Sequence, residues 1–329
     1  MLLIEDPRST DPAFNLALEE HLLMNLPMDQ DYLLLYVNRP SIVIGKHQNA
    51  VEEINTDHVE EHRMPVLRRQ SGGGTVYHDL GNLNFSFIRR YEPKYFNNYD
   101  HFTGLVAEAL RRMRVPATLN ERGDIYVEGK KVSGNAQAVR RDRMVSHGTL
   151  LFRSRLEDVS QALRTKPGKI SSKGRPSVRS QVTNIGNYLP AGMDMEAFRG
   201  ALLGRLFPDT ELLRPYMPGA ADLQAAAALA DGKYRTWEWN YGQSPNFDLE
   251  RDARLGASST RVRLHVEKGT VQEAELHAEG GDAAKLERLG PHLVGVKYRP
   301  EDLHAALAMG GASSILPGAT IRDWVRLLY

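Results

Sequence analysis

Apolar residues near the start of the chain recur at helical spacing. Asp11 followed by Pro12 is typical of a helix start, because aspartate accepts hydrogen bonds from free backbone N–H groups and proline fits the first helical position. Apolar residues from Phe14 to Leu22 then recur every three or four positions, and the pattern stops near Pro27. The sequence therefore predicts an early helix that buries one face.

Short apolar runs further along the chain predict strands. Residues 32–37 and 41–45 flank a proline-containing turn, which predicts a hairpin. Apolar and polar residues alternate over 83–87, as expected of a half-buried strand. Many antiparallel strands with few covering helices favour an α+β fold with mixed, largely antiparallel sheets. Other expected elements are a helix over 101–113 and strands over 66–69, 75–77, 124–127, 130–139 and 145–152, of which 124–127 and 130–139 form a hairpin.

A basic stretch over residues 165–181 interrupts these patterns. It is rich in glycine, proline and serine, carries five lysines or arginines, and contains no acidic residue. Because it has no apolar period, we predict a mobile surface loop.

The chain is predicted to consist of two domains, as its length of 329 residues also indicates. An alanine-rich helix over 220–232 and an aromatic segment are followed by a loop that ends near residue 246. We place the boundary there, which gives domains 1–245 and 246–329. The second domain is expected to contain a hairpin over 261–277 and three helices near 282–289, 301–308 and 321–328.

Composition narrows the possible chemistry. The chain has no cysteine, which excludes disulfides, thiolate metal sites and cysteine nucleophiles. Its net charge of +1 argues against nucleic-acid binding through bulk charge. No apolar run or leader pattern indicates a membrane span, so we expect a soluble cytoplasmic protein. The spacing of His47, His78 and His147 fits no zinc site, and we expect His78 and His147 to form hydrogen bonds within or beside the sheet.

The segment RRQSGGGT, residues 68–75, is the first candidate site. Three glycines after a strand let the backbone approach a ligand and turn its N–H groups toward an anion. An ordinary glycine-rich turn beside surface arginines explains the same residues equally well. The spacing matches neither a phosphate-binding P-loop nor a dinucleotide fingerprint.

The segment GKKVSGNAQ, residues 129–137, is the second candidate site. A lysine on a rigid strand can hold a carboxylate and then a phosphate as a point charge, which makes Lys131 a candidate. An exposed edge-strand lysine is the commoner explanation when this segment is considered alone. Asp124 begins the same hairpin and could bind Mg²⁺, or it could cap a turn.

Taken in order, these motifs resemble the bacterial lipoate–protein ligases. The resemblance extends over RRQSGGGTVYHD, GDIYVEGKKVSGNAQ, HGTLLF and KGRPSVRSQVTNI. It continues through TWEWNYGQSPNF and LVGVKY, which resemble the accessory C-terminal domain of the large form of these enzymes. The match spans nearly the whole chain. It departs from the family at Gly123, where relatives are expected to carry asparagine before the aspartate.

The resemblance implies a fold related to biotin ligases and a reaction in two steps. Lipoate and Mg·ATP would give lipoyl-AMP and pyrophosphate. A lysine of an acceptor would then take the lipoyl group. The implied acceptors are lipoyl domains of 2-oxoacid dehydrogenase E2 subunits and the glycine-cleavage H protein. No nucleic acid or membrane is implied as a partner.

The resemblance also assigns roles to individual residues. Lys131 would contact both lipoate and nucleotide and act as the catalytic residue, and Asp124 would be a tentative Mg²⁺ ligand. The remaining assignments are Arg69, Gly74, Thr75, Val76 and Tyr77 for ATP, Ser71, Gly73 and His78 for lipoate, and Lys173, Ser177, Val178 and Arg179 for a lid over the adenylate.

Three other functions compete with the ligase. An octanoyl or lipoyl transferase acting from a carrier protein remains possible if lysine assists it, although the cysteine-dependent enzymes are excluded. A biotin ligase would carry a different basic glycine-rich loop. A nucleic-acid binder could use the five basic residues of 165–181, but no aromatic residue there could stack on bases.

Overall fold

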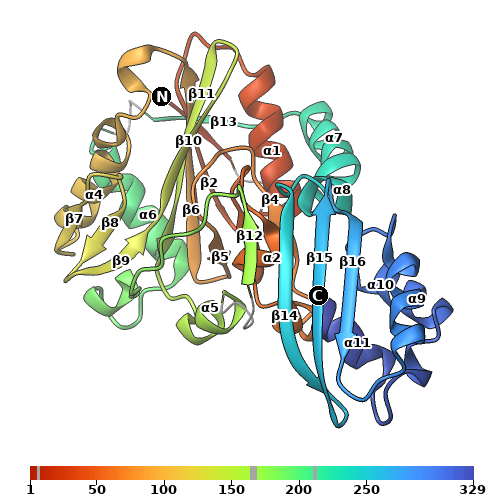
Figure 1. Cartoon of the computed structure of the whole chain (residues 1–329). Coiled ribbons are helices and arrows are strands. Elements are labelled where there is room, and N and C mark those ends of the chain that lie inside the picture. The colour runs from red at the N-terminus through yellow and green to blue at the C-terminus, as the bar shows by residue number, and fades with distance from the viewer. Residues whose placement is uncertain (6–7, 164–168, 210–212) are drawn as a thin grey trace. The chain divides into compact units, whose positions relative to one another are not determined.

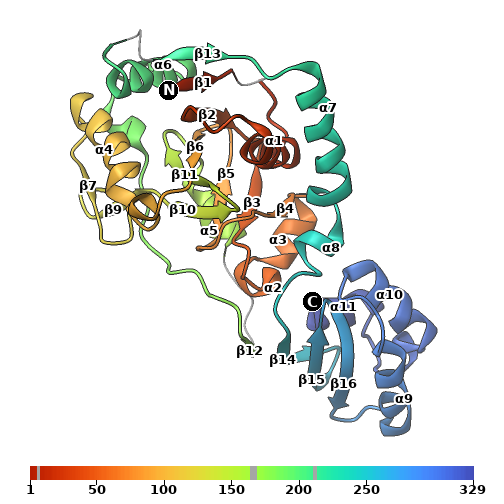
Figure 2. The same ribbon diagram turned by 90° about the horizontal axis from the view of Figure 1, so that it is seen from above.

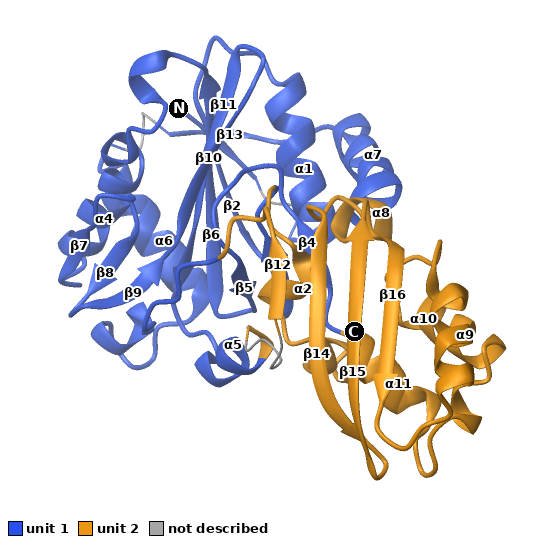
Figure 3. Ribbon diagram, in the orientation of Figure 1, with its two compact units in different colours: residues 1–46, 64–161, 177–236 blue, residues 47–63, 162–176, 237–329 orange. Residues whose placement is uncertain are grey.

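The computed structural model describes residues 1–5, 8–163, 169–209 and 213–329 (Figure 1). The chain forms two compact units, and each contains separate stretches of sequence (Figure 3). Unit 1 comprises residues 1–46, 64–161 and 177–236, and unit 2 comprises residues 47–63, 162–176 and 237–329. This division differs from the predicted boundary between residues 245 and 246 in two ways. The last stretch of unit 1 ends at Thr236, and unit 2 also includes residues 47–63 and 162–176.

Unit 1 is built around a six-stranded sheet in the order β10-β11-β6-β2-β1-β13. Neighbours from β10 to β2 are antiparallel, whereas β1 pairs in parallel with both β2 and β13. The mixed, largely antiparallel α+β architecture is therefore confirmed. The strands are β1 (Leu2–Ile4), β2 (Tyr32–Val37), β6 (Asn82–Arg90), β10 (Asn135–Arg140), β11 (Arg143–Leu151) and β13 (Arg214–Tyr216).

Helices cover both faces of this sheet (Figure 2). On one face, α1 (Pro12–Asn25) and α7 (Ala220–Leu229, continued by a π-helical turn Ala230–Tyr234) pack on the sheet. On the other face lie α4 (Thr103–Arg112) and α6 (Met195–Leu206). The prediction of a half-buried strand at 83–87 was wrong for this reason: the polar residues of β6 are also buried, because α1 covers them.

Helix α1 begins as predicted, since the Asp11 side chain accepts a hydrogen bond from the Ala13 N–H and Pro12 is the first helical residue. Its apolar residues Leu18, Leu22 and Leu23 pack against strands β2, β6 and β11 of the sheet. Local capping and side-chain spacing were sufficient to predict this element.

Two three-stranded sheets complete unit 1, in the orders β4-β3-β5 and β7-β8-β9. The predicted hairpin of 124–127 with the strand that follows is confirmed by the antiparallel pairing of β8 with β9, whereas one predicted pairing and one predicted strand were wrong. Strands β2 and β3 lie in different sheets and form no hairpin. The predicted strand 130–139 is divided at Gly134 into β9 and β10, which also belong to different sheets. The strands are β3 (Ser41–Ile44), β4 (Val66–Arg68), β5 (Val76–His78), β7 (Ala117–Leu119), β8 (Ile125–Val127) and β9 (Lys130–Ser133).

Unit 2 contains a four-stranded antiparallel sheet in the order β12-β14-β15-β16, with the predicted hairpin as its last two strands. The prediction of a loop over 165–181 was partly wrong, because β12 (Lys169–Ser172) pairs with β14 and Ile170 packs against the core. Residues 165–168 of that prediction lie outside the described residues. The remaining strands are β14 (Phe247–Leu255), β15 (Ser258–Glu267) and β16 (Thr270–Ala278).

The three C-terminal helices were predicted correctly and form the core of unit 2 with this sheet. Val51 of α2 joins that core, which explains why residues 47–63 belong to this unit. In the described ranges, every helix is too short or too polar to span a lipid bilayer. Helix α5 (Leu156–Ala162) precedes β12 in the chain. The remaining helices are α2 (Ala50–Glu53), α3 (Thr56–Glu61), α8 (Trp237–Asn240), α9 (Ala283–Leu293), α10 (Pro300–Met309) and α11 (Ile321–Leu328).

Candidate active site

Residues 69–75, which we call the glycine loop, connect β4 to β5 in unit 1 (Figure 1). Gly73 has a φ of +88°, a conformation that is strained for residues with a side chain. A Cβ added to Gly45, at the end of β3, would lie 2.1 Å from the Gly73 carbonyl oxygen. The two glycines therefore allow the loop to pack directly against β3.

The Arg69 side chain binds the carbonyl groups of the glycine loop. Its Nη2 donates to the carbonyl oxygens of Gly72 at 2.6 Å and Gly74 at 2.7 Å, and its Nη1 donates to Val43 at 3.1 Å. Burial lowers the pKa of Arg69 to about 10, so the guanidinium is charged at neutral pH. Arg69 orients the loop, and its predicted contact with a nucleotide stays a prediction.

The N–H groups of the three glycines in the glycine loop have no acceptor among the described residues. In the part of the chain that the structure describes, those of Gly72, Gly73 and Gly74 donate no hydrogen bond. Gly73 is exposed and its two neighbours are half-buried. Because the loop's carbonyls face Arg69 and Gly45, the unused N–H groups can converge on an anion. Binding of an anion there stays a prediction.

Strand β9 brings Lys131 to the end of the glycine loop. The Lys131 Nζ lies 2.8 Å from Oδ2 of Asp124, and both side chains are largely shielded from solvent. A Cβ added to Gly134 would contact Lys131 Nζ at 3.3 Å and Val76 Cγ1 at 3.8 Å. The amine therefore lies beside the first residue of β5, directly after the loop. The structure brings together the two segments singled out in the sequence.

The end of the basic stretch links these two parts of the site. The Thr75 N–H donates to Ser177 Oγ at 2.8 Å. The Lys131 N–H donates to the Gln181 carbonyl, and the Thr183 N–H donates to the Lys131 carbonyl. Residues 177–183 thus run from the glycine loop to β9.

The four predicted lid residues do not lie together in one unit. Ser177, Val178 and Arg179 belong to unit 1, whereas Lys173 belongs to unit 2. Val178 is 67% exposed, and a single exposed valine does not by itself indicate a covering group. The lid itself stays a prediction.

The residues assigned to β5 differ in exposure. Val76 is half-buried beside Lys131, whereas the Tyr77 side chain is buried and burial raises its pKa to about 12. His78 is also buried. Its Nδ1 bonds to Asn38 Nδ2 at 2.9 Å, as expected for a histidine beside the sheet, and its Nε2 has no partner among the described residues. Burial, with help from the nearby charge of Arg69, lowers the pKa of His78 to about 3.

The sequence analysis missed Glu19, which lies on the buried side of α1. Its carboxylate bonds to His147 Nδ1 of β11 at 2.9 Å, and His147 Nε2 bonds to Ser71 Oγ at 2.6 Å. The signal was present: a glutamate next to Leu18 on the apolar face of a predicted helix requires a buried partner. The expected hydrogen bonding of His147 is confirmed.

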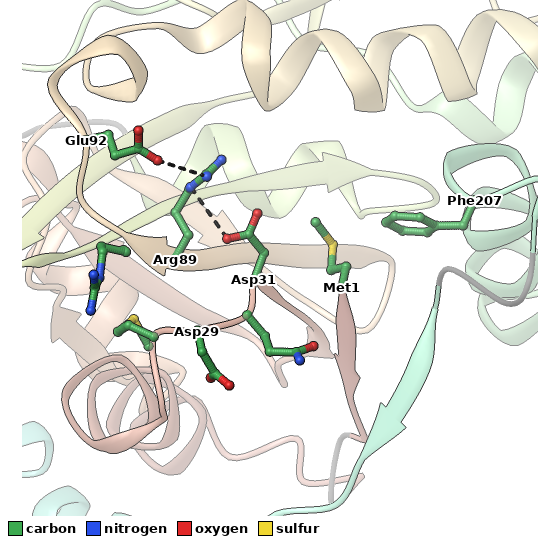
Figure 4. A pocket seen from close by; sticks show the side chains of 9 residues that line it. Met1, Asp29, Asp31, Arg89, Glu92 and Phe207 are labelled. Carbon is green, nitrogen blue, oxygen red and sulfur yellow. Dashed lines mark ion pairs between the residues drawn. The ribbon is translucent and has the colours of Figure 1, made fainter.

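A separate pocket of about 700 Å³ lies in unit 1 and contains none of the predicted site residues (Figure 4). Its Arg89 is already paired with Asp31 at 3.6 Å and with Glu92 at 3.5 Å. We therefore assign the candidate site to the glycine loop and Lys131.

Comparison with known proteins agrees with this assignment. The family described as the lipoyl protein ligase A/B catalytic domain matches residues 11–207, and the bacterial lipoate protein ligase C-terminus matches residues 244–328. The chain belongs to the lipoate–protein ligase family. It is 41% identical to lipoate-protein ligase LplJ of Bacillus subtilis, with 100% of both chains covered. It is 40% identical to lipoate–protein ligase 1 of Staphylococcus aureus, with 94% of each covered.

Solved structures of other lipoate ligases are similar to this chain. A lipoate-protein ligase A bound with ATP has a TM-score of 0.62 and 28% identity, covering 74% of this chain and 98% of its own. A Thermoplasma acidophilum protein with bound lipoic acid has a TM-score of 0.61 and 27% identity, covering 73% and 98%. A bipartite ligase from the same organism, studied with its E2 lipoyl domain, has a TM-score of 0.63 and 26% identity, covering 74% and 96%.

Proposed function

We propose that this lipoate–protein ligase converts lipoate and ATP to lipoyl-AMP and transfers the lipoyl group to a lysine of an acceptor protein. The observation that carries the proposal is that Gly72–Gly74, whose N–H groups are unused among the described residues, lead into β5 at Val76, near which the Lys131 amine lies. Both supply positive potential where charge develops during adenylation. The similar structures solved with ATP and with lipoic acid support the choice of ligands.

In the first step, a carboxylate oxygen of lipoate attacks the α-phosphorus of ATP. The bond from that phosphorus to the bridging oxygen breaks, and pyrophosphate leaves. Lys131 would hold the carboxylate and then the α-phosphate, which requires its amine to exchange Asp124 for the substrate. The glycine-loop N–H groups would bind phosphate oxygens, with further contacts from Thr75 and Val76.

In the second step, the neutral amine of the acceptor lysine attacks the acyl carbon. The bond to the adenylate oxygen breaks, AMP leaves, and the amine loses a proton. This step needs no nucleophile from the enzyme, so it is compatible with a chain that lacks cysteine. We propose E2 lipoyl domains as acceptors, which the relative studied with such a domain supports, and the glycine-cleavage H protein as a second acceptor.

Mg²⁺ is proposed as a companion of ATP. One or two carboxylates plus substrate phosphates are its usual ligands, and Asp124 is the candidate carboxylate. Among the described residues, no three acidic or histidine side chains form a metal site, so the phosphates would supply most of the ligands. When bound, the ion would neutralise phosphate charge. The predicted cytoplasmic location stays a prediction.

Release of pyrophosphate that requires both lipoate and ATP tests this function. Lys131→Ala is expected to lower the rate by about 100-fold or more, as loss of a group that stabilises transition-state charge does. Lys130→Ala is the matched control, because Lys130 is the exposed neighbour on the same strand. ATP-independent lipoyl or octanoyl transfer from a carrier protein, without pyrophosphate release, would contradict the proposal and favour a transferase.

A further inference from the structure

Four buried side chains form a hydrogen-bonded chain behind the glycine loop, and the proposed chemistry uses none of them as a reacting group. Arg69 Nε donates to Ser71 Oγ at 2.9 Å, and Ser71 Oγ lies 2.6 Å from His147 Nε2. His147 Nδ1 lies 2.9 Å from Glu19 Oε1. All four residues are at most 8% exposed. We call them the Arg69–Glu19 chain.

The order of the partners determines where the protons lie. An ionised carboxylate only accepts, so His147 must carry its proton on Nδ1 and donate it to Glu19. In the singly protonated form of His147, Nε2 accepts from the Ser71 hydroxyl, whose oxygen accepts from Arg69 in turn. Every bond in the chain has one donor and one acceptor.

Charge balance explains why Glu19 is ionised in this position. Burial alone would raise the pKa of Glu19, but the charge of His147, the hydrogen bonds from His147 and Ser86, and the charge of Arg69 together lower it. Glu19 and Arg69 are thus opposite charges at the two ends of one buried series of hydrogen bonds. A buried charge that loses its counter-charge is strongly unfavourable, so each end of the chain depends on the other.

The Arg69–Glu19 chain connects the glycine loop to rigid elements. Glu19 belongs to α1 and His147 to β11, and Ser86 of β6 also donates a hydrogen bond to Glu19. At the other end, Arg69 holds the carbonyls of Gly72 and Gly74. A change at Glu19 is therefore transmitted to the loop through a series of buried, hydrogen-bonded side chains.

We propose that Glu19 and His147 are positioning residues that keep the glycine loop in its anion-binding shape and so determine the affinity for the nucleotide. The proposal rests on the proposed function for the identity of the anion, but the effect on loop shape exists without any ligand. Binding groups keep a productive geometry only when neighbouring side chains fix them by packing and hydrogen bonds.

The same geometry also has the order of a serine–histidine–acid triad, in which Ser71 would be a nucleophile. Two observations favour positioning. Ser71 is 1% exposed, and its hydroxyl oxygen already accepts from Arg69. A nucleophile would leave a lipoyl ester on the enzyme when acceptor is absent, whereas a positioning role leaves the enzyme unmodified.

Hydrogen exchange of the ligand-free protein tests loop shape directly. In Glu19→Gln, exchange of the hydrogen-bonded loop amides of Arg69 and Thr75, which donate to the Ile44 carbonyl and to Ser177 Oγ, is expected to accelerate by about tenfold, because the loop opens more often. The matched control is Glu20→Gln, since Glu20 is the next residue of α1 and its carboxylate bonds to Lys233 and Tyr234 instead. Glu20→Gln is expected to leave exchange in the loop unchanged. Ser71→Ala interrupts the chain with a smaller change and serves if Glu19→Gln does not fold.

Kinetics with lipoate and ATP then test the consequence for function. Glu19→Gln is expected to raise the KM for ATP by about tenfold while kcat falls much less, because only loop placement is lost. Glu19→Asp retains the charge and is expected to recover part of the effect. Glu20→Gln is expected to match the wild type.

The outcomes separate this inference from the proposed function. A wild-type enzyme without lipoate-dependent pyrophosphate release would refute the proposed function, while the exchange experiment would still report on the loop. An active wild type, together with unchanged exchange and unchanged KM in Glu19→Gln and Ser71→Ala, would overturn the positioning role. An intact mass increased by one lipoyl group after incubation without acceptor would assign Ser71 as a nucleophile and overturn it as well.

Discussion

Replacing Gly45 by alanine should disrupt the glycine loop without touching any ligand. The added Cβ would lie 2.1 Å from the Gly73 carbonyl oxygen and 3.1 Å from its carbon, and both are backbone atoms that cannot rotate away. The loop or the end of β3 must therefore move. Gly73 cannot easily adapt, because its φ of +88° is already in the region that favours glycine.

The size of the effect follows from the overlap. Cβ atoms almost never approach other atoms closer than 3.0 Å, so the backbone must separate by about 1 Å. Misplacing catalytic groups by that distance costs about 100-fold in rate, or about 2.7 kcal/mol of transition-state stabilisation. We therefore expect kcat/KM for ATP to fall by about two orders of magnitude in Gly45→Ala.

The assay is lipoate-dependent release of pyrophosphate, with Gly72→Ala as the matched control. Gly72 lies in the loop itself, but an added Cβ there meets nothing within 4 Å, its φ is not positive, and alanine retains the N–H group. Gly72→Ala should stay within about threefold of the wild type. Equal losses in the two variants, or a fully active Gly45→Ala, would refute the close packing of the loop on β3 as the basis of activity.

Two other predictions test parts of the site. Burial lowers the pKa of His78 to about 3, so below about pH 6.5 the unfolded chain binds a proton at this histidine while the folded chain does not. The free energy of unfolding should therefore fall by about 1.4 kcal/mol per pH unit as the pH decreases below that value. Urea unfolding at pH 7 and pH 5 measures this fall, and the contribution should vanish in His78→Asn. Trypsin should cleave after the exposed Lys173 or Arg179 before other sites, and lipoate with ATP should slow this cleavage if the segment closes over the adenylate. An unchanged rate would count against a lid.

Elements with strong local signals were predicted from the sequence. The Asp11 cap, the spacing of leucines in α1, and the alternation in β15 and β16 all depend on neighbouring residues, so they were recognisable without knowledge of the fold. The candidate site was recognisable for the same reason, because the triple glycine and the lysine-bearing hairpin are both continuous in sequence.

Partners that lie far apart in the sequence could not be predicted. The short apolar runs of β2 and β3 identified two strands but not the sheet to which each strand belongs. Ile170 is one apolar residue in a basic stretch, and only pairing of β12 with β14 makes that segment a strand. Glu19 and His147 are 128 residues apart, so their contact follows from the packing of α1 on β11 and from no local pattern.

A crystal structure with bound lipoyl-AMP tests the central claim most directly. The account predicts that an oxygen of the phosphate lies about 2.7–3.2 Å from at least one N–H nitrogen of Gly72–Gly74, and that Lys131 Nζ leaves Asp124 to contact the phosphate or the acyl oxygen. A phosphate bound away from both the glycine loop and Lys131, with the ion pair to Asp124 intact, would contradict it.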